Sequence, residues 1–328
     1  MKDQVHLLYG TGGGHFNPDN NPTPSSITAL LDELQSLGIK HIDTAAVYPS
    51  AQPGLSETLL GQVKASERFT IDTKIMVKPH GVGSADGELT RDSIRASVQT
   101  SLERLGVSSV NCLYAHRPDP HTSLEETAGA FSEVVKEGKA KMWGISNYTA
   151  EDTAKLLSIC EKNGYVKPAI FQGMYNAICR FPEADLFPVL REHGVAFTCY
   201  SPTAGGFLSG VLTTGSGAAG PSRYQGARGA HWKSLYDKPE IHDALRVLIR
   251  KCEERGMGLM EGCLRWLAWH SGLKGLSEGS GIILGASRAG QMEENVGAVE
   301  KGELDKELAE AFEVMWKDVE GSAPKGLI

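Results

Sequence analysis

The sequence predicts an α/β fold of one class, a (β/α)8 TIM barrel, in which eight parallel strands alternate with helices. Three observations predict it: eight short apolar segments suited to strands, amphipathic helical patterns between them, and a chain of 328 residues. Barrels of this class often reach that length as one domain, so we expect a single domain over residues 1–328. The same alternation also allows an open, doubly wound sheet, which is the alternative fold.

The predicted strands are eight apolar segments of strand length. They occupy residues 5–11, 41–45, 69–75, 111–117, 140–146, 169–175, 195–201 and 281–287. Helical patterns separate them, the clearest at residues 24–38, 91–106, 123–138 and 149–164. These four keep apolar residues at three- and four-residue spacing and end on a glycine suited to a C-terminal cap. Ser123 opens one of them with the Ser-x-x-Glu pattern of a capping box, and Thr149 opens another in a similar way.

Two long insertions interrupt this alternation, at residues 12–24 after the first strand and 205–239 after the seventh. Loops of this length in a compact domain usually carry function. Both follow strand ends, so we expect them on the C-terminal face of the barrel, where barrel enzymes keep their chemistry.

Composition and charge limit the classes of partner. The net charge of -7 and the pI near 5.8 argue against a nucleic acid or an anionic membrane surface. No apolar run approaches the roughly 20 residues of a membrane helix, and the N-terminus lacks a signal-peptide pattern. The six cysteines form no C-x-x-C pair, which argues against zinc ribbons and thioredoxin-type chemistry. We therefore expect a cytoplasmic protein.

Polar residues fall where three neighbouring strands end. Asp43 ends the second predicted strand, Lys74 the third and His116 the fourth, with Tyr48 just beyond Asp43. An ammonium group favours the phenolate of a nearby tyrosine and lowers its pKa, and a carboxylate offsets the cost of burying the lysine. A histidine can orient a carbonyl oxygen by a hydrogen bond. Together the four describe a site that gives a proton to a carbonyl while another group adds to its carbon.

Each of these residues alone has an ordinary structural explanation, such as loop capping, packing or a surface charge. Their occurrence together in chain order favours a catalytic site. No His-x-His pair or cluster of carboxylates stands at the strand ends, which argues against a metal-dependent hydrolase. Residues 215–220 match the pattern G-x-G-x-x-G, but no strand precedes them and no helix follows, so we interpret them as flexible loop and not as a dinucleotide fingerprint.

The order Asp43, Tyr48, Lys74 and His116 resembles the catalytic tetrad of the aldo-keto reductases. Further motifs extend the similarity over nearly the whole chain: GLSETLLG (54–61), GISNY (144–148), QGMYNA (172–177) and CYSPTAGGFLSG (199–210). The QGMYN motif and the segment 285–295 resemble the aflatoxin-aldehyde reductase subfamily most closely.

This resemblance implies NADPH-dependent reduction of an aldehyde or ketone. The hydride would come from the nicotinamide and the proton from Tyr48, with Lys74 and Asp43 tuning Tyr48 and His116 orienting the carbonyl. It implies a cofactor bound across the barrel rim without a Rossmann domain. The implied cofactor residues are Ser146, Asn147 and Gln172 for the carboxamide, Tyr200 for the ring, Ser201, Pro202, Gly206, Leu208 and Gly210 near the pyrophosphate, Arg223 in the insertion, and Gly285, Ser287, Arg288, Gln291 and Asn295 after the last strand. A hydroxyl and a guanidinium at a helix N-terminus suit the 2′-phosphate, which favours NADPH over NADH.

The substrate is expected to be bulky, aromatic or related to natural products. Subfamily members that take carboxylate-bearing aldehydes carry further arginines late in the long insertion and at the C-terminus, whereas here those segments read GAHWKSLYDKP and KGLI. Phe16, Trp232 and Tyr236 would suit a larger carbonyl beside Tyr48 and His116. The resemblance also suggests a homodimer. The alternatives are a cofactor-binding regulatory subunit similar to the potassium-channel β subunits, and a barrel that has lost its activity.

Overall fold

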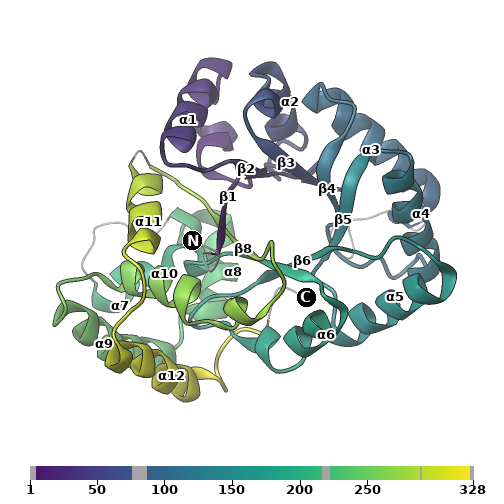
Figure 1. Cartoon of the computed structure of the whole chain (residues 1–328). Helices are drawn as coiled ribbons and strands as arrows, with labels where there is room; N and C mark the ends of the chain where they lie inside the picture. The colour runs from purple at the N-terminus through teal and green to yellow at the C-terminus, as the bar shows by residue number, and fades with distance from the viewer. Residues whose placement is uncertain (1–4, 76–86, 216–221, 289, 326–328) are drawn as a thin grey trace.

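The computed structural model describes residues 5–75, 87–215, 222–288 and 290–325 and shows a closed barrel (Figure 1). Its eight strands pair in chain order, every pair parallel, and β8 closes the sheet against β1. The (β/α)8 prediction is confirmed, and the doubly wound alternative is wrong because its sheet would stay open.

Each strand lies within or close to its predicted segment. The strands are β1 His6–Gly10, β2 His41–Asp43, β3 Thr70–Lys74, β4 Val110–Ala115, β5 Ala140–Ser146, β6 Ile170–Met174, β7 Ala196–Tyr200 and β8 Gly281–Leu284. Several end earlier than predicted because the chain leaves the ladder where the polar residues begin. His116, for example, follows the last residue of β4. The strands are buried on both faces, as parallel strands between a barrel interior and a helical layer must be.

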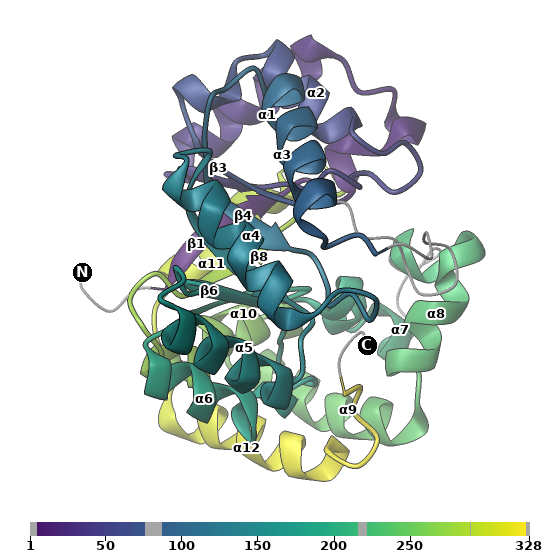
Figure 2. The ribbon, with the colours of Figure 1, turned by 90° about the vertical axis from the view of Figure 1, so that its right-hand side faces the viewer.

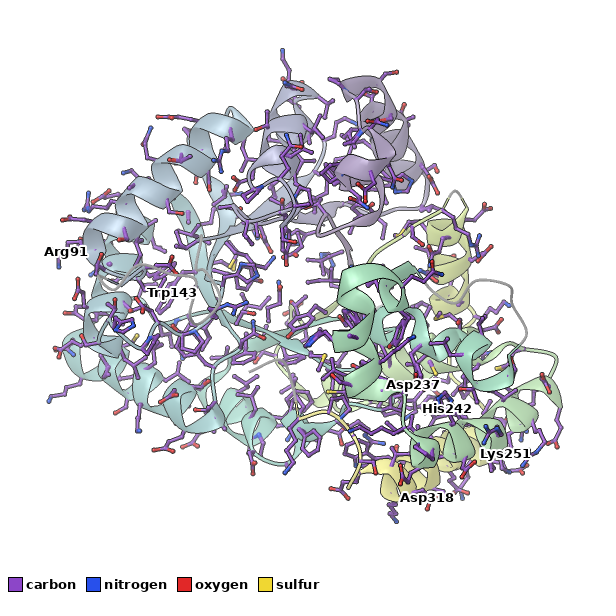
Figure 3. The ribbon with its side chains drawn as sticks, turned by 180° about the vertical axis from the view of Figure 1, so that it is seen from behind. Arg91, Trp143, Asp237, His242, Lys251 and Asp318 are labelled. Carbon is purple, nitrogen blue, oxygen red and sulfur yellow. The ribbon has the colours of Figure 1, made fainter. Side chains whose placement is uncertain are left out.

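Helices surround the barrel on the outside (Figure 1). They are α1 Pro24–Ser36, α2 Leu55–Gln62, α3 Arg91–Leu105, α4 Leu124–Lys136, α5 Ala150–Asn163, α6 Leu186–His193, α7 Val211–Thr214, α8 Gly226–Tyr236, α9 Pro239–Glu253, α10 Leu259–Trp269, α11 Gln291–Glu300 and α12 Lys306–Val319. Trp143 of β5 shows how they pack: its ring stacks on Phe131 of α4 with centroids 4.8 Å apart, on the outer side of the barrel (Figure 3). No helix among the described residues has both the length and the apolar character to cross a membrane.

The predicted helix ends are largely confirmed. Gly106 and Gly164, for example, follow α3 and α5 with φ of 66° and 63°, the left-handed conformation that glycine adopts without strain. Ser123 caps α4 by accepting a hydrogen bond from Glu126 N at 3.1 Å. Glu126, however, accepts from Arg91 N at the start of α3, so its carboxylate is used between two helices and no capping box closes there. The box with both of its hydrogen bonds stands at Thr23 and Ser26, before α1.

The two insertions contain more helix than predicted. The first holds the short 3-10 helices η1 Gly14–Phe16 and η2 Pro18–Asn20, and the second holds η5 Ala204–Ser209, α7, η6 Ser222–Tyr224 and α8. Figure 2 shows α7 and α8 at the end of the barrel opposite the N-terminus, which is the C-terminal face. Of the GSGAAG segment, residues 216–220 lie outside the described residues.

Candidate active site

The four residues of the predicted catalytic set meet at the C-terminal face. Asp43 and Lys74 are the last residues of β2 and β3, and His116 follows β4. Because parallel strands of a barrel end at the same rim, these three side chains are brought together although they are far apart in the sequence. Tyr48 lies in the loop between β2 and α2, and its ring packs against the His116 ring at this rim.

Lys74 and Asp43 form a buried ion pair. The ammonium Nζ lies 2.7 Å from both carboxylate oxygens and donates a further hydrogen bond to Thr44 O at 2.8 Å. Lys74 is fully buried and Asp43 is 3% exposed. Gln172 Nε2 donates to Asp43 Oδ1 at 2.8 Å, so the carboxylate is held from two strands. Burial alone would lower the pKa of Lys74, but Asp43 and Tyr48 outweigh it and the pKa is raised.

Tyr48 packs between the ion pair and His116. Lys74 Nζ lies 5.0 Å from the centre of the Tyr48 ring, and the His116 ring meets it edge-on with centroids 5.5 Å apart. Burial raises the pKa of Tyr48 above its ordinary value, while Lys74 acts to lower it. The expected influence of Lys74 is therefore present, but the expected fall in the pKa of Tyr48 does not result. At neutral pH the phenol stays protonated and can act as a donor.

His116 is neutral in this environment. Burial, with added effects of the Lys74 and Arg117 charges, lowers its pKa well below the usual range. Its backbone carbonyl accepts a hydrogen bond from Asn147 Nδ2 at 3.0 Å, which ties the end of β4 to the end of β5. A neutral imidazole here can orient a polar oxygen without adding a second positive charge beside Lys74.

The residues implied for the carboxamide and the ring lie around the same centre. Asn147, with φ of 63°, donates to Ser146 Oγ at 3.0 Å and accepts from the Tyr200 hydroxyl at 2.7 Å. Gln172 reaches the Asp43 carboxylate, as described above. Hydroxyl and amide groups at the ends of β5, β6 and β7 are thus hydrogen-bonded to one another, to the Asp43 carboxylate and to the His116 carbonyl.

The loop after β7 is folded on itself. Gly206 N and Leu208 N donate to Thr203 O at 2.9 and 3.3 Å, and Gly210 N donates to Phe207 O at 3.1 Å. Pro202 and the Leu208 side chain are buried, and Asn176 Nδ2 holds Ser201 O at 3.0 Å. These three N–H groups therefore have acceptors within the loop itself. Arg223, from η6, places its guanidinium 5.4 Å from the centre of the Trp232 ring.

In the segment after β8, the polar side chains form hydrogen bonds with one another. Gln291 Oε1 accepts from Ser287 N at 2.7 Å and from Ser287 Oγ at 3.3 Å. Arg288 is exposed and pairs with Glu294, Nη1 to Oε1 at 2.9 Å. Asn295 is buried on α11, whereas Gly285 is exposed at the surface. The Ser287 hydroxyl and the Arg288 guanidinium expected for a 2′-phosphate are therefore present at the surface, where each bonds to a neighbouring side chain.

The three aromatic residues predicted to line the substrate pocket are buried by packing in the folded chain. Phe16 and Tyr236 are fully buried, and Trp232 is 8% exposed. Trp232 stacks on Tyr236 with centroids 6.2 Å apart, and Tyr236 stacks in turn on Phe207 at 5.8 Å. These contacts indicate that Trp232 and Tyr236 form the apolar core of the insertion after β7. Burial likewise favours a packing role for Phe16.

The structure adds two features that the sequence reasoning missed. The glycine run after β1 fits against the site: a Cβ on Gly12 would lie 3.3 Å from Tyr48 Cζ, and one on Gly14 would lie 1.8 Å from Ala286 O. The run of glycines at residues 12–14 is the feature of the sequence that could have indicated this close packing. The second feature is Arg117, whose position directly after His116 could have identified it. Among the described residues, no group of three or more His, Cys, Asp or Glu side chains could hold a metal ion.

Comparison with known proteins decides the family. The profile of the aldo/keto reductase family matches residues 8–317. The chain belongs to the aldo/keto reductase family. As a member of it, the protein is an oxidoreductase. The chain is 36% identical to the oxidoreductase sirO of Leptosphaeria maculans over 90% of this chain and 86% of the relative. It is 33% identical to the aflatoxin B1 aldehyde reductase member 4 of Homo sapiens over 90% and 89%. A probable voltage-gated potassium channel subunit beta of Arabidopsis thaliana is 32% identical over 83% and 81%.

Proposed function

We propose that this aldo/keto reductase uses NADPH to reduce an aldehyde or ketone to the alcohol, with Tyr48 as the proton donor. The observation that carries the proposal is the arrangement of Tyr48 between neutral His116 and a lysine ammonium fixed by Asp43. A protonated phenol beside a fixed cation can give up its proton to an oxygen that gains negative charge.

Each residue has a separate task. His116 donates a hydrogen bond that orients the carbonyl oxygen toward the Tyr48 hydroxyl. Tyr48 then transfers its proton to that oxygen, and Lys74 stabilises the phenolate that is left. Thr44 and Gln172 keep the Lys74–Asp43 pair in place, so little reorganisation is needed when the charge moves to Tyr48. Solvent returns the proton to Tyr48 after the alcohol has left.

The residues present fit a nicotinamide cofactor. Ser146, Asn147 and Gln172 offer a hydroxyl and two amides beside Tyr48, a set that matches the donors and acceptors of a carboxamide. Tyr200 presents an aromatic ring, and Ser287 and Arg288 suit the 2′-phosphate once Arg288 leaves Glu294. When bound, NADPH supplies the hydride that adds to the carbonyl carbon, and NADP+ is released.

A turnover assay tests the proposal. The absorbance of the reduced nicotinamide would be followed with a panel of carbonyls, from small aldehydes to bulky aromatic ketones, with NADH in parallel. We expect consumption of NADPH that depends on the carbonyl and clearly exceeds that of NADH. Absence of turnover with every carbonyl would contradict the proposal.

The regulatory alternative has one observation in its favour, the similarity to a probable potassium channel subunit beta. Such a protein would bind the cofactor and turn over slowly. NADPH binding without turnover, together with recovery of a channel protein in a pull-down, would favour this alternative. The assembled set of Asp43, Tyr48, Lys74 and His116 favours the enzyme.

A further inference from the structure

Glu57 is a buried carboxylate that the proposed mechanism does not use. It stands in the first turn of α2 and is fully buried. Its Oε1 atom accepts a hydrogen bond from Thr73 Oγ1 at 2.6 Å, and its Oε2 atom accepts one from Arg104 Nη1 at 3.3 Å. Because a buried ion pair adds little net stability compared with apolar residues, stability alone does not explain a charge at this position.

The bonds of Glu57 join three elements. Glu57 belongs to α2, Thr73 to β3 and Arg104 to α3, and α2 lies next to α3 (Figure 1). Successive side chains of a strand point to opposite faces, so Thr73 points out to α2 while Lys74 points to the catalytic set. The Glu57 carboxylate is therefore bonded to the residue directly before the catalytic lysine.

The same turn of α2 is also bonded to the loop that carries Tyr48. Ser56, directly before Glu57, donates its backbone N–H to Tyr48 O at 3.1 Å. The first turn of α2 thus holds the backbone of the proposed proton donor. A shift of this turn relative to β3 would move Tyr48 relative to Lys74, whose Nζ lies 5.0 Å from the centre of the Tyr48 ring.

Arg104 packs closely against both ends of the segment GLSETLLG (54–61). At Gly54, where φ is 87°, a Cβ would lie 2.6 Å from Arg104 Cζ. At Gly61, near the end of α2, a Cβ would lie 2.0 Å from Arg104 O. The two glycines therefore let α2 approach α3 closely, and the Arg104 guanidinium lies beside the turn that contains Glu57.

We propose that Glu57 is a positioning residue: it keeps the first turn of α2 fixed against β3 and so holds Tyr48 beside the Lys74 ammonium. The inference rests on the proposed function, in which Lys74 stabilises the phenolate that Tyr48 leaves. The attraction between a phenolate and an ammonium group weakens as their separation grows. A displacement of about 1 Å at a reacting group can cost on the order of 100-fold in rate. Glu57 therefore acts on the proton transfer and not on the binding of the cofactor.

Three variants test the two bonds of Glu57, with 4-nitrobenzaldehyde as the carbonyl. Glu57→Leu removes both bonds, and Arg104, whose side chain is 30% exposed, can then turn to solvent. We expect kcat to fall by about 10- to 100-fold while the Kd for NADPH stays close to that of the wild type. Glu57→Gln keeps an acceptor for Thr73 and should retain more of kcat. Thr73→Val removes only the bond to β3 and should also lower kcat, so it serves if Glu57→Leu does not fold.

The Tyr48→Phe background distinguishes positioning from damage to the fold. If Glu57 acts through the Tyr48 hydroxyl, Glu57→Leu should cost little once that hydroxyl has been removed, because the two effects are coupled. The residual rates of Tyr48→Phe with and without Glu57→Leu are compared in single turnovers, with enzyme in excess over NADPH. Damage to the fold would instead lower the rate by the same factor in both backgrounds.

Ser132→Ala is the matched control. The buried Ser132 hydroxyl accepts a hydrogen bond from Val166 N at 2.9 Å and joins α4 to the segment before β6, so its loss should leave kcat at the wild-type value. Thermal melts followed by circular dichroism check that each variant folds. Wild-type kcat in Glu57→Leu and Thr73→Val, or an equal fractional loss in both backgrounds, would overturn the inference and leave Tyr48 as the donor. Turnover by Tyr48→Phe at the wild-type rate would overturn the proposed function and the inference with it.

Discussion

At the scale of single residues, the site depends on a buried charge pair whose geometry leaves little freedom. All three N–H donors of Lys74 have acceptors among Asp43 and Thr44. A buried pair of this kind adds little net stability compared with apolar residues, but removing one partner leaves an uncompensated charge in the interior. The pair is thus better explained by its effect on Tyr48 than by stability.

Asp43→Asn tests this explanation. The substitution keeps the shape of the side chain and removes its charge, so we expect the free energy of unfolding to fall by about 3 to 5 kcal/mol and turnover to be lost. Asp43→Leu combined with Lys74→Met removes both charges and should recover much of the stability with no recovery of activity. Chemical denaturation and the nicotinamide assay measure the two effects. A single variant as stable as the wild type would contradict the buried pair.

At the scale of elements, the glycine run after β1 packs between Tyr48 and the segment after β8. Gly14 has φ of 59° and no room for a Cβ, because Ala286 O would be 1.8 Å away. Gly12 lies against the Tyr48 ring two residues earlier. The connection after β1 therefore lies against both Tyr48, the proposed proton donor, and the segment after β8.

Gly14→Ala and Gly38→Ala separate backbone strain from steric overlap. Both glycines have positive φ, but a Cβ on Gly38, which lies just beyond the end of α1, would meet nothing within 4 Å. We expect Gly38→Ala to cost roughly 1 kcal/mol of stability and to leave kcat unchanged. Gly14→Ala should cost about 1 to 3 kcal/mol more and lower kcat, since the connection must move beside Tyr48. Equal effects in stability and kcat would show that the contact with Ala286 is unimportant.

The sequence predicted the elements better than the contacts between them. Alternating apolar segments and terminal glycines are local signals, and they located all eight strands and helix ends such as Gly106. Tertiary contacts decided the rest. Glu126 closes onto Arg91 of another helix in place of its own cap. Trp232 and Tyr236 looked suited to a substrate pocket because a sequence shows aromatic character, but only the fold shows that these rings stack on each other and on Phe207.

The meeting of Asp43, Lys74 and His116 could be predicted because a barrel brings the ends of successive strands to one rim. The direction in which the pKa of Tyr48 shifts could not be predicted from the sequence, because it depends on how deeply the side chain is buried. Arg117 was missed for a similar reason: its Nε is buried without an acceptor, and only the folded chain shows this.

At the scale of the whole molecule, the two ends of the barrel carry different chemistry. At the N-terminal end, His41 Nε2 lies 2.9 Å from the buried Asp72 Oδ1, and His41 Nδ1 lies 3.3 Å from His6 Nε2. Burial would lower the pKa of His41, but the contact with Asp72 outweighs it and the pKa is raised. This end of the barrel therefore favours a protonated His41, in contrast to neutral His116 at the opposite end.

The raised pKa of His41 makes the free energy of unfolding depend on pH, and the sign of this dependence is known. Because the folded pKa of His41 exceeds its unfolded value of about 6.5, its stabilisation is fully present below that pH and is lost as the pH rises through the folded pKa. We expect the stability difference between wild type and His41→Gln to be larger at about pH 5.5 than at about pH 8.5. Denaturant titrations at both pH values measure it. A difference that does not change with pH would rule out the charged His41–Asp72 pair.

The assignment of Tyr48 as the proton donor is tested most directly by Tyr48→Phe, which keeps the ring and removes the hydroxyl. Turnover with NADPH and NADPH binding, read by protein fluorescence, would be measured on the same preparation. We predict that kcat/KM falls at least about 100-fold while the Kd for NADPH stays close to that of the wild type. Turnover near the wild-type rate in Tyr48→Phe would contradict it, because the proton would then come from another group.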